Sequence, residues 1–402
     1  MNRYQDAARF IVAVFLIGAC RRSLSVMGTP LARLLLTFIR NLRFTFPKPI
    51  QMQTRKQFLI NSLSLASGAA LLGFKMPVQP EAPYITFDLH CHPGKLFAHG
   101  GNEFGENFPP EKTLGDMNAA HLSGAFFALV ADSKLLKPGP AGISIVGQYQ
   151  AGEAWQEYKL QLREMKDFLF RNNLIPATTA KELTIAGPLA PYIAVEGGDF
   201  LESQADKLEE AYDDGVRCIQ LVHYVPNTLG DLQTAAAVHN GLSEFGKAVV
   251  RKMNRLGMLV DVAHASYQTT KDVASATDAP IMLSHSILEM ETGRPIAKRA
   301  ISKEHAKLVA DTGGIIGAWP SGFNKSFDEF ADNTLRLVDA VGIDHVGIGT
   351  DMDGNFKPVL STYTQYPTFA ETLKNKGLAA NEVEKIMGGN AAALLKKVLK
   401  KR

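Results

Sequence analysis

Residues 257–286 read GMLVDVAHASYQTTKDVASATDAPIMLSHS and contain a pattern that recurs along the chain. Two short apolar runs, residues 258–262 and 280–283, are separated by a longer amphipathic stretch, and His264 and His285 follow them. Short apolar runs that alternate with longer amphipathic stretches are typical of strand–helix units that build a parallel sheet. The segment therefore predicts two neighbouring parallel strands, each followed by an ionisable side chain.

Eight such runs occur along the chain, and we predict that each forms a β-strand. Eight parallel strands with helices outside can close into a barrel, whereas a doubly wound open sheet usually stops at about five or six strands. We therefore predict a single (β/α)8 TIM barrel of the metal-dependent hydrolase type over residues 81–402. The predicted strands are residues 84–89, 124–131, 192–195, 218–222, 258–262, 280–283, 314–318 and 345–349, and the helices between them include residues 152–172, 204–214, 242–255, 302–311 and 327–341.

The first 80 residues differ in composition from the rest of the chain. Residues 1–75 contain eleven Lys or Arg and one acidic residue, a balance typical of targeting segments. The sequence Thr54-Arg-Lys-Gln-Phe-Leu-Ile precedes an apolar run, residues 63–74, that is short for a membrane span. We predict that residues 1–80 are an export signal or N-terminal extension, with a later start at Met52, and that the protein reaches the periplasm or cell envelope. The alternative is a membrane-anchoring helix at residues 10–19 or 59–74.

The charge of the remaining chain excludes one class of partner. The sequence has 43 basic and 40 acidic side chains; without residues 1–75, 32 and 39 remain, a formal charge of −7. Binding to nucleic acid needs a basic surface that neutralises phosphates. We therefore predict no nucleic-acid partner, and membrane association only through the N-terminal segment. Cys91 and Cys218 are too few for a disulfide framework and are interpreted as buried thiols.

Ionisable side chains gather where the predicted strands end. In a barrel, the carboxyl ends of all strands lie at one rim, which is where active sites form. Chance would scatter these residues between both rims. They are Asp88, His90 and His92 after the first strand, Glu196 after the third, His223 after the fourth, Asp261 and His264 around the fifth, His285 after the sixth, and Asp351 and Asp353 after the eighth.

Five of these residues are candidate metal ligands. His90 and His92 are two residues apart, so on a strand both imidazoles project from the same face. His264 and His285 add nitrogen ligands suited to zinc or a similar divalent ion, although each alone could be a hydrogen-bonded core histidine. Two close cations repel each other and need an anionic bridge, for which Glu196 is the candidate. We predict a site for two divalent ions, with zinc as the preferred metal.

Asp351 is the candidate for proton transfer. It follows the last predicted strand, and a carboxylate there can hold a metal-bound water and accept its proton as the water attacks. The alternative is a residue that forms a turn. Asp353 and Gly354 fit that description better, because Asp-Gly pairs favour turns.

These segments together resemble the membrane (renal) dipeptidase family, peptidase family M19, of the amidohydrolase superfamily. They span most of residues 84–354 in the expected order, and those around His264, His285 and Asp351 are the most specific. The matching segments are Phe87-Asp-Leu-His-Cys-His, Val195-Glu-Gly-Gly, Leu221-Val-His-Tyr, Gly257-Met-Leu-Val-Asp-Val-Ala-His-Ala-Ser, Pro280-Ile-Met-Leu-Ser-His-Ser, Gly293-Arg-Pro, Asp311-Thr-Gly-Gly-Ile-Ile and His345-Val-Gly-Ile-Gly-Thr-Asp-Met-Asp-Gly.

The resemblance implies a function and further site residues. It implies a zinc-dependent hydrolase that uses a metal-bound hydroxide to cleave a small amide substrate, with a dipeptide as the first candidate. His223 would polarise the scissile carbonyl, Arg294 would receive the substrate carboxylate, and Asp351 would be the proton acceptor. The resemblance also implies that Glu196 bridges the ions and that His264 and His285 complete the second metal position.

Three features depart from the family pattern and leave the substrate open. The chain has His90-Cys-His92 where the family usually has His-x-Asp, and residues 124–130 lack the family's aromatic and polar signature. The segment Tyr224-Val-Pro-Asn-Thr-Leu-Gly-Asp replaces an Asn-rich one. A lactone, phosphoester or deaminase substrate on the same rim is one alternative, and a catalytically silent envelope binding protein is another. The sequence does not predict the oligomeric state.

Overall fold

Eight parallel strands follow one another around a barrel in chain order in the computed structural model, which describes residues 84–95, 109–139, 142–185, 187–289 and 298–399. Each corresponds to one of the eight predicted strands, so the (β/α)8 prediction is confirmed. The strands are β1 (Phe87–Cys91), β2 (Gly124–Val130), β5 (Ala190–Glu196), β6 (Val216–Gln220), β7 (Leu259–Asp261), β8 (Met282–Leu288), β10 (Ile315–Ala318) and β11 (Val346–Ile348).

One strand differs clearly from its predicted length. β8 runs through His285 to Leu288 instead of ending at residue 283. Its last residues, Ile287 and Leu288, pair with β9 (Ala300–Ile301), a short strand that the sequence pattern did not predict. Pairing with a partner distant in sequence therefore extended β8 beyond its apolar run.

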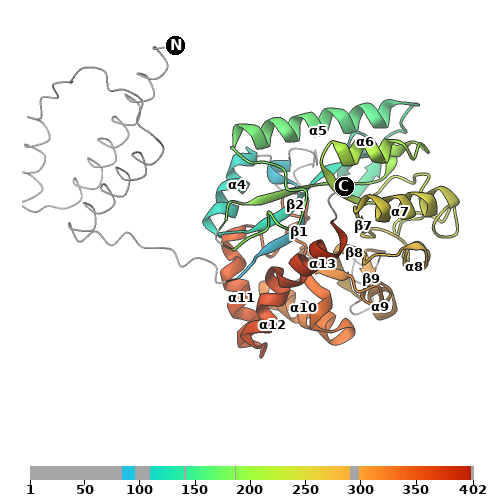
Figure 1. The fold of residues 1–402 in the computed structure, drawn as a ribbon. Helices are drawn as coiled ribbons and strands as arrows, with labels where there is room; N and C mark the ends of the chain where they lie inside the picture. The colour runs from blue at the N-terminus through green and yellow to red at the C-terminus, as the bar shows by residue number, and fades with distance from the viewer. Residues whose placement is uncertain (1–83, 96–108, 140–141, 186, 290–297, 400–402) are drawn as a thin grey trace, which may run out of the picture. The chain divides into compact units, whose positions relative to one another are not determined.

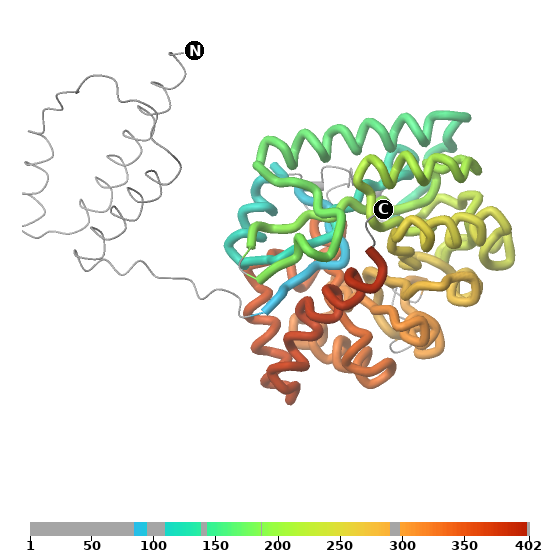
Figure 2. Tube along the Cα trace, viewed as in Figure 1, coloured from blue at the N-terminus to red at the C-terminus, as the bar shows by residue number. Residues whose placement is uncertain are grey.

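Helices surround the strands (Figure 1). The chain passes once around the ring, so the blue β1 lies beside red C-terminal segments in Figure 2, and β1 also contacts β11 and α13. The predicted helices correspond to α5 (Glu153–Arg171), α6 (Lys207–Asp213), α7 (Glu244–Leu256), α9 (Lys303–Asp311) and α10 (Phe327–Val341). The structure adds α4 (Pro110–Ala119), α8 (Tyr267–Ala276), α11 (Tyr366–Asn375), α12 (Ala380–Glu384), α13 (Asn390–Val398) and a hairpin, β3 (Leu136–Gly139) and β4 (Gly142–Ile145).

Several of these helices begin at a serine that caps their first turn. Ser243, Ser302 and Ser326 precede α7, α9 and α10, and each hydroxyl accepts a hydrogen bond from a backbone N–H three residues later. Such a cap satisfies one of the free N–H groups at a helix start and stabilises the helix by about 1 kcal/mol. The caps fix where each helix leaves the loop that carries site residues.

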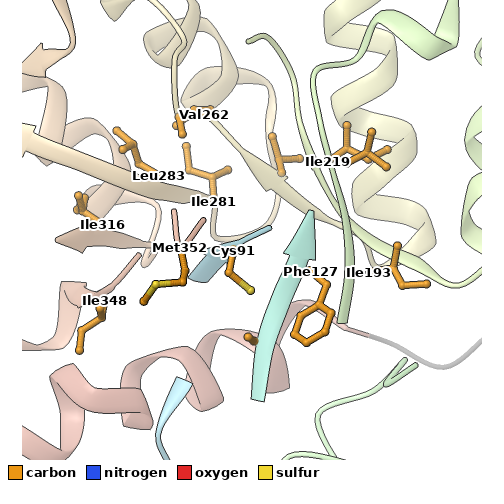
Figure 3. Packing of buried hydrophobic residues seen from close by; sticks show 14 of the residues in the cluster. Cys91, Phe127, Ile193, Ile219, Val262, Ile281, Leu283, Ile316, Ile348 and Met352 are labelled. Carbon is orange, nitrogen blue, oxygen red and sulfur yellow. The ribbon is translucent and has the colours of Figure 1, made fainter. Parts of the chain in front are cut away.

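Apolar side chains form two layers, one outside the ring of strands and one inside it. Phe127, Ile193 and Ile219 belong to the outer layer, which also contains helix residues and is shown in part in Figure 3. Phe126 and Ala128 of β2 belong to a separate inner cluster that continues onto α13. Because this inner cluster is built mainly from the beginnings of the strands, α13 covers that end of the barrel. The other rim is left for the ionisable side chains.

The N-terminal predictions lie outside the described residues. These are the export signal or extension at residues 1–80, the start at Met52, and the alternative anchoring helix. In the part of the chain that the structure describes, every helix is too short or too polar to cross a bilayer. Cys91 and Cys218 are buried free thiols, as predicted.

His305 on α9 is a buried histidine whose neutral form is favoured by the fold. Its Nε2 lies 2.8 Å from the Thr270 hydroxyl of α8, and burial lowers its pKa from 6.5 to about 4. Between these two pH values the unfolded chain binds more protons than the folded one. The free energy of unfolding contributed by His305 is therefore present above pH 6.5 and falls, by about 1.4 kcal/mol per pH unit, as the pH drops toward 4.

We predict that His305→Gln, which keeps a polar contact to Thr270, reduces this loss of stability. Chemical denaturation at several pH values between 4 and 6.5 measures the difference from the unchanged protein. His121→Asn, at an exposed histidine, is the control and should keep the original slope. Parallel pH profiles for His305→Gln and the unchanged protein would contradict the prediction.

Candidate metal centre

The predicted site residues converge at the rim where the strands end. Seven of the eight lie within one buried group, and the eighth, Arg294, lies outside the described residues. His90 is the next-to-last residue of β1, which ends at Cys91, and His285 lies within β8. The seven residues are His90, His92, Glu196, His223, His264, His285 and Asp351.

The carboxylate of Glu196 is the common neighbour of the imidazoles. Its own strand, β5, ends at this residue, and Gln220 of β6 donates to it at 3.3 Å. Imidazole nitrogens surround it closely, yet none lies at the short distance of a charge-assisted hydrogen bond. The Nε2 distances to its oxygens are 3.5 Å for His90, 3.4 Å for His92, 3.4 Å for His223, 3.6 Å for His264 and 3.9 Å for His285.

The spacing between these donor atoms matches the spacing around a metal ion. The Nε2 atoms of His90 and His92 are 3.1 Å apart, and so are those of His264 and His285. Asp351 Oδ1 lies 3.3 Å from His92 Nε2. Ligand bonds of about 2.0–2.1 Å in a tetrahedron place neighbouring donors roughly 3.3 Å apart. The donor set therefore fits divalent ions held between its members.

Hydrogen bonds on the far side of the rings select the tautomer that a metal needs. His92 Nδ1 lies 3.0 Å from the Ala128 carbonyl, which can only accept, so Nδ1 carries the proton. His285 Nδ1 is 3.0 Å from the Ser284 hydroxyl, which can accept a hydrogen bond from it. A ring whose Nδ1 donates presents the lone pair of Nε2 to the site.

Burial and neighbouring charges set the protonation of the group. Burial lowers the pKa of His264 and His285 well below the ordinary value, so both are neutral near pH 7. Burial opposes a charge on His92 too, but Asp351 and Glu196 outweigh it and raise its pKa to about 10. Burial also opposes the charge of Glu196, yet neighbouring histidines hold its pKa well below the usual range. The surroundings of His92 therefore favour a positive charge, whether proton or metal ion.

Two of these residues have a strained backbone. His264 has φ 63° and Asp351 has φ 52°, in the left-handed region that side chains other than glycine rarely adopt. Such conformations each cost on the order of 1–3 kcal/mol and cluster at functional sites. Gly354 packs closely beside Asp351 and His92, since a Cβ there would lie 2.8 Å from Asp351 Oδ1 and 2.5 Å from a ring carbon of His92. The strain and the close approach both indicate that geometry here is held for chemistry.

Asp132 is a site residue that the sequence prediction missed. It is fully buried, its Oδ1 lies 2.7 Å from His223 Nδ1, and its Oδ2 accepts from the backbone N–H groups of Tyr224 and Val225. Burial lowers the pKa of His223, but Asp132 and Glu196 outweigh it and raise that pKa. The signal was present, because Asp132 directly follows a predicted strand like the residues that were chosen.

Arg299 is the second missed residue. It is buried, its Nη1 donates to Gln233 at 2.6 Å, and its Nε and Nη2 have no hydrogen-bond partner among the residues that the structure describes. Its charge acts on His264 and His285, and its guanidinium lies 5.4 Å from the centre of the Trp319 ring. A buried cation with unused donors beside a metal site is suited to bind an anion. Only the fold shows this position of Arg299, because the sequence around Arg299 carries no motif.

Comparison with known proteins identifies the family to which the chain belongs. The membrane dipeptidase family (peptidase family M19) matches residues 81–402. The chain belongs to this family. The earlier resemblance is thereby confirmed, and so is the prediction of a metal-dependent hydrolase of the dipeptidase type.

Individual relatives are distant. Dipeptidase aclJ of Aspergillus oryzae is 26% identical over 393 residues, covering 87% of this chain and 90% of aclJ. Dipeptidase verJ of Clonostachys rogersoniana is 28% identical over 225 residues, covering 54% of this chain and only 57% of verJ. A metallo peptidase from Rhodobacter sphaeroides, solved with a phosphinate mimic of the dipeptide L-Ala-D-Ala, has a TM-score of 0.65 and 20% identity, with 78% of this chain and 99% of that chain covered. This last likeness shows the shared fold.

We predict that Asp132→Asn lowers kcat by about 10- to 100-fold while the metal content of the protein stays unchanged. The amide cannot stabilise a charged His223 ring as the carboxylate does. Steady-state kinetics and elemental analysis of the same preparation measure the two effects. Asp214→Asn, at a carboxylate that instead accepts from Lys159 and Lys166, is the control. Unchanged kcat, or loss of metal, in Asp132→Asn would contradict this role.

Proposed function

We propose that the protein hydrolyses dipeptides with the help of two bound divalent ions, and that zinc is the preferred metal. The observation that carries the proposal is the buried group of imidazoles and carboxylates at tetrahedral spacing. A donor set rich in nitrogen favours zinc over magnesium or calcium, which prefer oxygen. We assign His90, His92 and Asp351 to the first ion, His264 and His285 to the second, and Glu196 to the position between them.

Ions held there would lower the pKa of bound water and polarise a carbonyl oxygen. The residues of the chain then handle the proton. Asp351 is the more exposed of the two central carboxylates, with 8% of its surface accessible against 3% for Glu196, which is enclosed by imidazoles. Asp351 can therefore take a proton from the attacking water and pass it to the leaving amine.

His223 is placed to stabilise the oxyanion that forms at the scissile carbonyl. Asp132 accepts from its Nδ1, and the raised pKa of the ring favours the form with a second N–H at Nε2. That Nε2 faces the site, 3.4 Å from Glu196 Oε1. A donor fixed in advance, in a buried site, stabilises a developing negative charge without rearrangement.

Arg299 is suited to receive the terminal carboxylate of the substrate. Its Nε and Nη2 are buried and without a hydrogen-bond partner in the described part of the chain, while Nη1 is fixed by Gln233. A guanidinium binds a carboxylate through two parallel hydrogen bonds, which also sets the orientation of the peptide. The family resemblance assigns this role to Arg294, and we favour Arg299 because its unused donors belong to the described site. The dipeptide mimic bound by the Rhodobacter sphaeroides relative supports a substrate of this size.

The proposal predicts hydrolysis of dipeptides by zinc-loaded protein and no turnover of lactones. A substrate panel with both classes measures this, and activity restricted to lactones would contradict the dipeptide assignment. Asp351→Asn should lower kcat by about 10²- to 10⁴-fold, because the amide cannot accept the proton. Its metal content should persist, because the amide oxygen remains a ligand.

Asp353→Asn is the matched control for this variant. The carboxylate of Asp353 accepts from Gly94 N at 2.7 Å and from the Thr113 hydroxyl, outside the metal group. It should therefore keep most of its activity. Full activity in Asp351→Asn, measured on preparations with equal metal content, would rule out its role in proton transfer.

We predict that Arg299→Met lowers kcat/KM for a dipeptide by about 10- to 100-fold, the usual range for a lost hydrogen bond to a charged group. With the C-terminal amide of the same dipeptide, the variant and the unchanged protein should differ little, because no carboxylate is present. Arg294→Met is the comparison and should behave like the unchanged protein with both substrates. If the selective loss appears in Arg294→Met instead, the carboxylate belongs to Arg294.

A further inference from the structure

Two seams of the barrel lack a continuous backbone ladder, and each carries the ligands of one proposed metal position. β1 and the residues that follow β11 are joined by one isolated bridge between Cys91 and Met352, in which Asp351 N donates to His90 O and His92 N donates to Met352 O, both at 2.9 Å. β7 and β8 share a single register pair, Asp261 with Met282. In contrast, β2 and β5 pair along their whole lengths. The spacing of the strands at each of the two seams is therefore set by one backbone bridge together with other contacts.

At the first seam, a buried aspartate adds a second link beside the single bridge. Asp88 Oδ1 accepts from His90 N at 3.1 Å and from Thr350 N at 2.9 Å, so one oxygen holds both strands. Its Oδ2 accepts from the Thr350 hydroxyl and from Tyr363 Oη. Asp88 is inaccessible to solvent. On one side of this contact is the ligand His90, and on the other is the residue before Asp351.

The second seam repeats this arrangement. Asp261 Oδ1 accepts from Ala263 N at 2.9 Å and from Ser284 N at 3.0 Å. As at the first seam, one donor lies two residues further along the chain, and the other lies on the opposite side of the seam. Ala263 precedes His264, and Ser284 precedes His285. Each aspartate therefore fixes the backbone directly beside one ligand on either side of a seam.

We propose that Asp88 and Asp261 are positioning residues, each of which sets the distance between the ligands of one metal position. The inference rests on the proposed two-ion function. Metal–ligand distances have to be held to about 0.2 Å, which a single backbone bridge between two strands does not secure by itself. One carboxylate oxygen shared by backbone groups of two strands does provide it. Asp88 then serves the position of His90, His92 and Asp351, and Asp261 serves that of His264 and His285.

The first test removes the shared oxygen and measures zinc affinity by competition with a chelator. Asp88→Ala and Asp261→Ala should each weaken the binding of one of the two ions by about 10- to 100-fold and spare the other. Asp88→Asn and Asp261→Asn keep an acceptor oxygen for the two backbone groups and should restore the affinity. In Asp261→Asn the new amide takes the position of Oδ2, which has no partner.

Double variants identify which ion each aspartate serves. His92→Ala removes a ligand of the first position, so adding Asp88→Ala should leave the affinity of the remaining ion unchanged. Adding Asp88→Ala to His264→Ala should instead weaken the one ion that is left. The opposite pattern is expected for Asp261→Ala. Equal losses in both backgrounds would overturn the assignment of one aspartate to one position.

Asn390→Ala is the control for a purely structural effect. Asn390 Nδ2 donates to the carbonyls of Ile343 and Val346. These carbonyls lie at the start of β11, at the opposite end of the strand from Asp351. This variant should lower Tm and keep both ions. The proposal is overturned if the alanine variants of Asp88 and Asp261 behave in the same way, with lower Tm and unchanged affinities.

Two further outcomes are also decisive. If Asp88→Ala does not fold, Asp88→Ser is used in its place. The serine hydroxyl can accept from His90 N but is too short to hold Thr350 as well. If neither variant folds, a local positioning role is overturned. The unchanged protein is measured in parallel. If it binds fewer than two ions, the proposed function fails. If it binds two ions and the alanine variants of Asp88 and Asp261 bind both with unchanged affinity, only the inference about the aspartates is refuted.

Discussion

One buried carboxylate surrounded by imidazole nitrogens is the constraint on which the rest of the structure depends. Five Nε2 atoms lie 3.4–3.9 Å from the oxygens of Glu196. Neutral imidazoles that direct lone pairs at one another and at a carboxylate repel, so the group is stable only with positive charge between its members. Protons can supply that charge, and so can metal ions. The donor spacing and the family of the chain both favour metal.

Because the ligands come from different strands, their geometry is only as accurate as the spacing of those strands. The barrel supplies most of that accuracy through its ladders and through two apolar layers, with α13 covering the opposite end. At two seams the ladder is reduced to one bridge, and a buried aspartate adds a second link between the strands. The structure thus places backbone strain, close packing and buried charge at the same rim. Each of these costs stability, which the large apolar layers offset.

Much of this was predictable because strand ends in a parallel barrel must share a rim. His264 and His285 follow apolar runs of simple periodicity, so both the strands and the placement of the two side chains could be read from the sequence. Asp132 obeys the same rule and was overlooked. Arg299 could not be found in this way, because it reaches the site through β9, whose two residues pair only with the extended end of β8. Contacts between segments distant in sequence determine that position, and periodicity carries no information about them.

The most direct test of the two-ion centre is a crystal structure of the zinc-loaded protein with anomalous diffraction recorded at the zinc edge. We expect two anomalous peaks about 3.5 Å apart, with Glu196 between them, one peak beside His90 and His92 and the other beside His264 and His285. One peak, or none, at this rim under saturating zinc would contradict it.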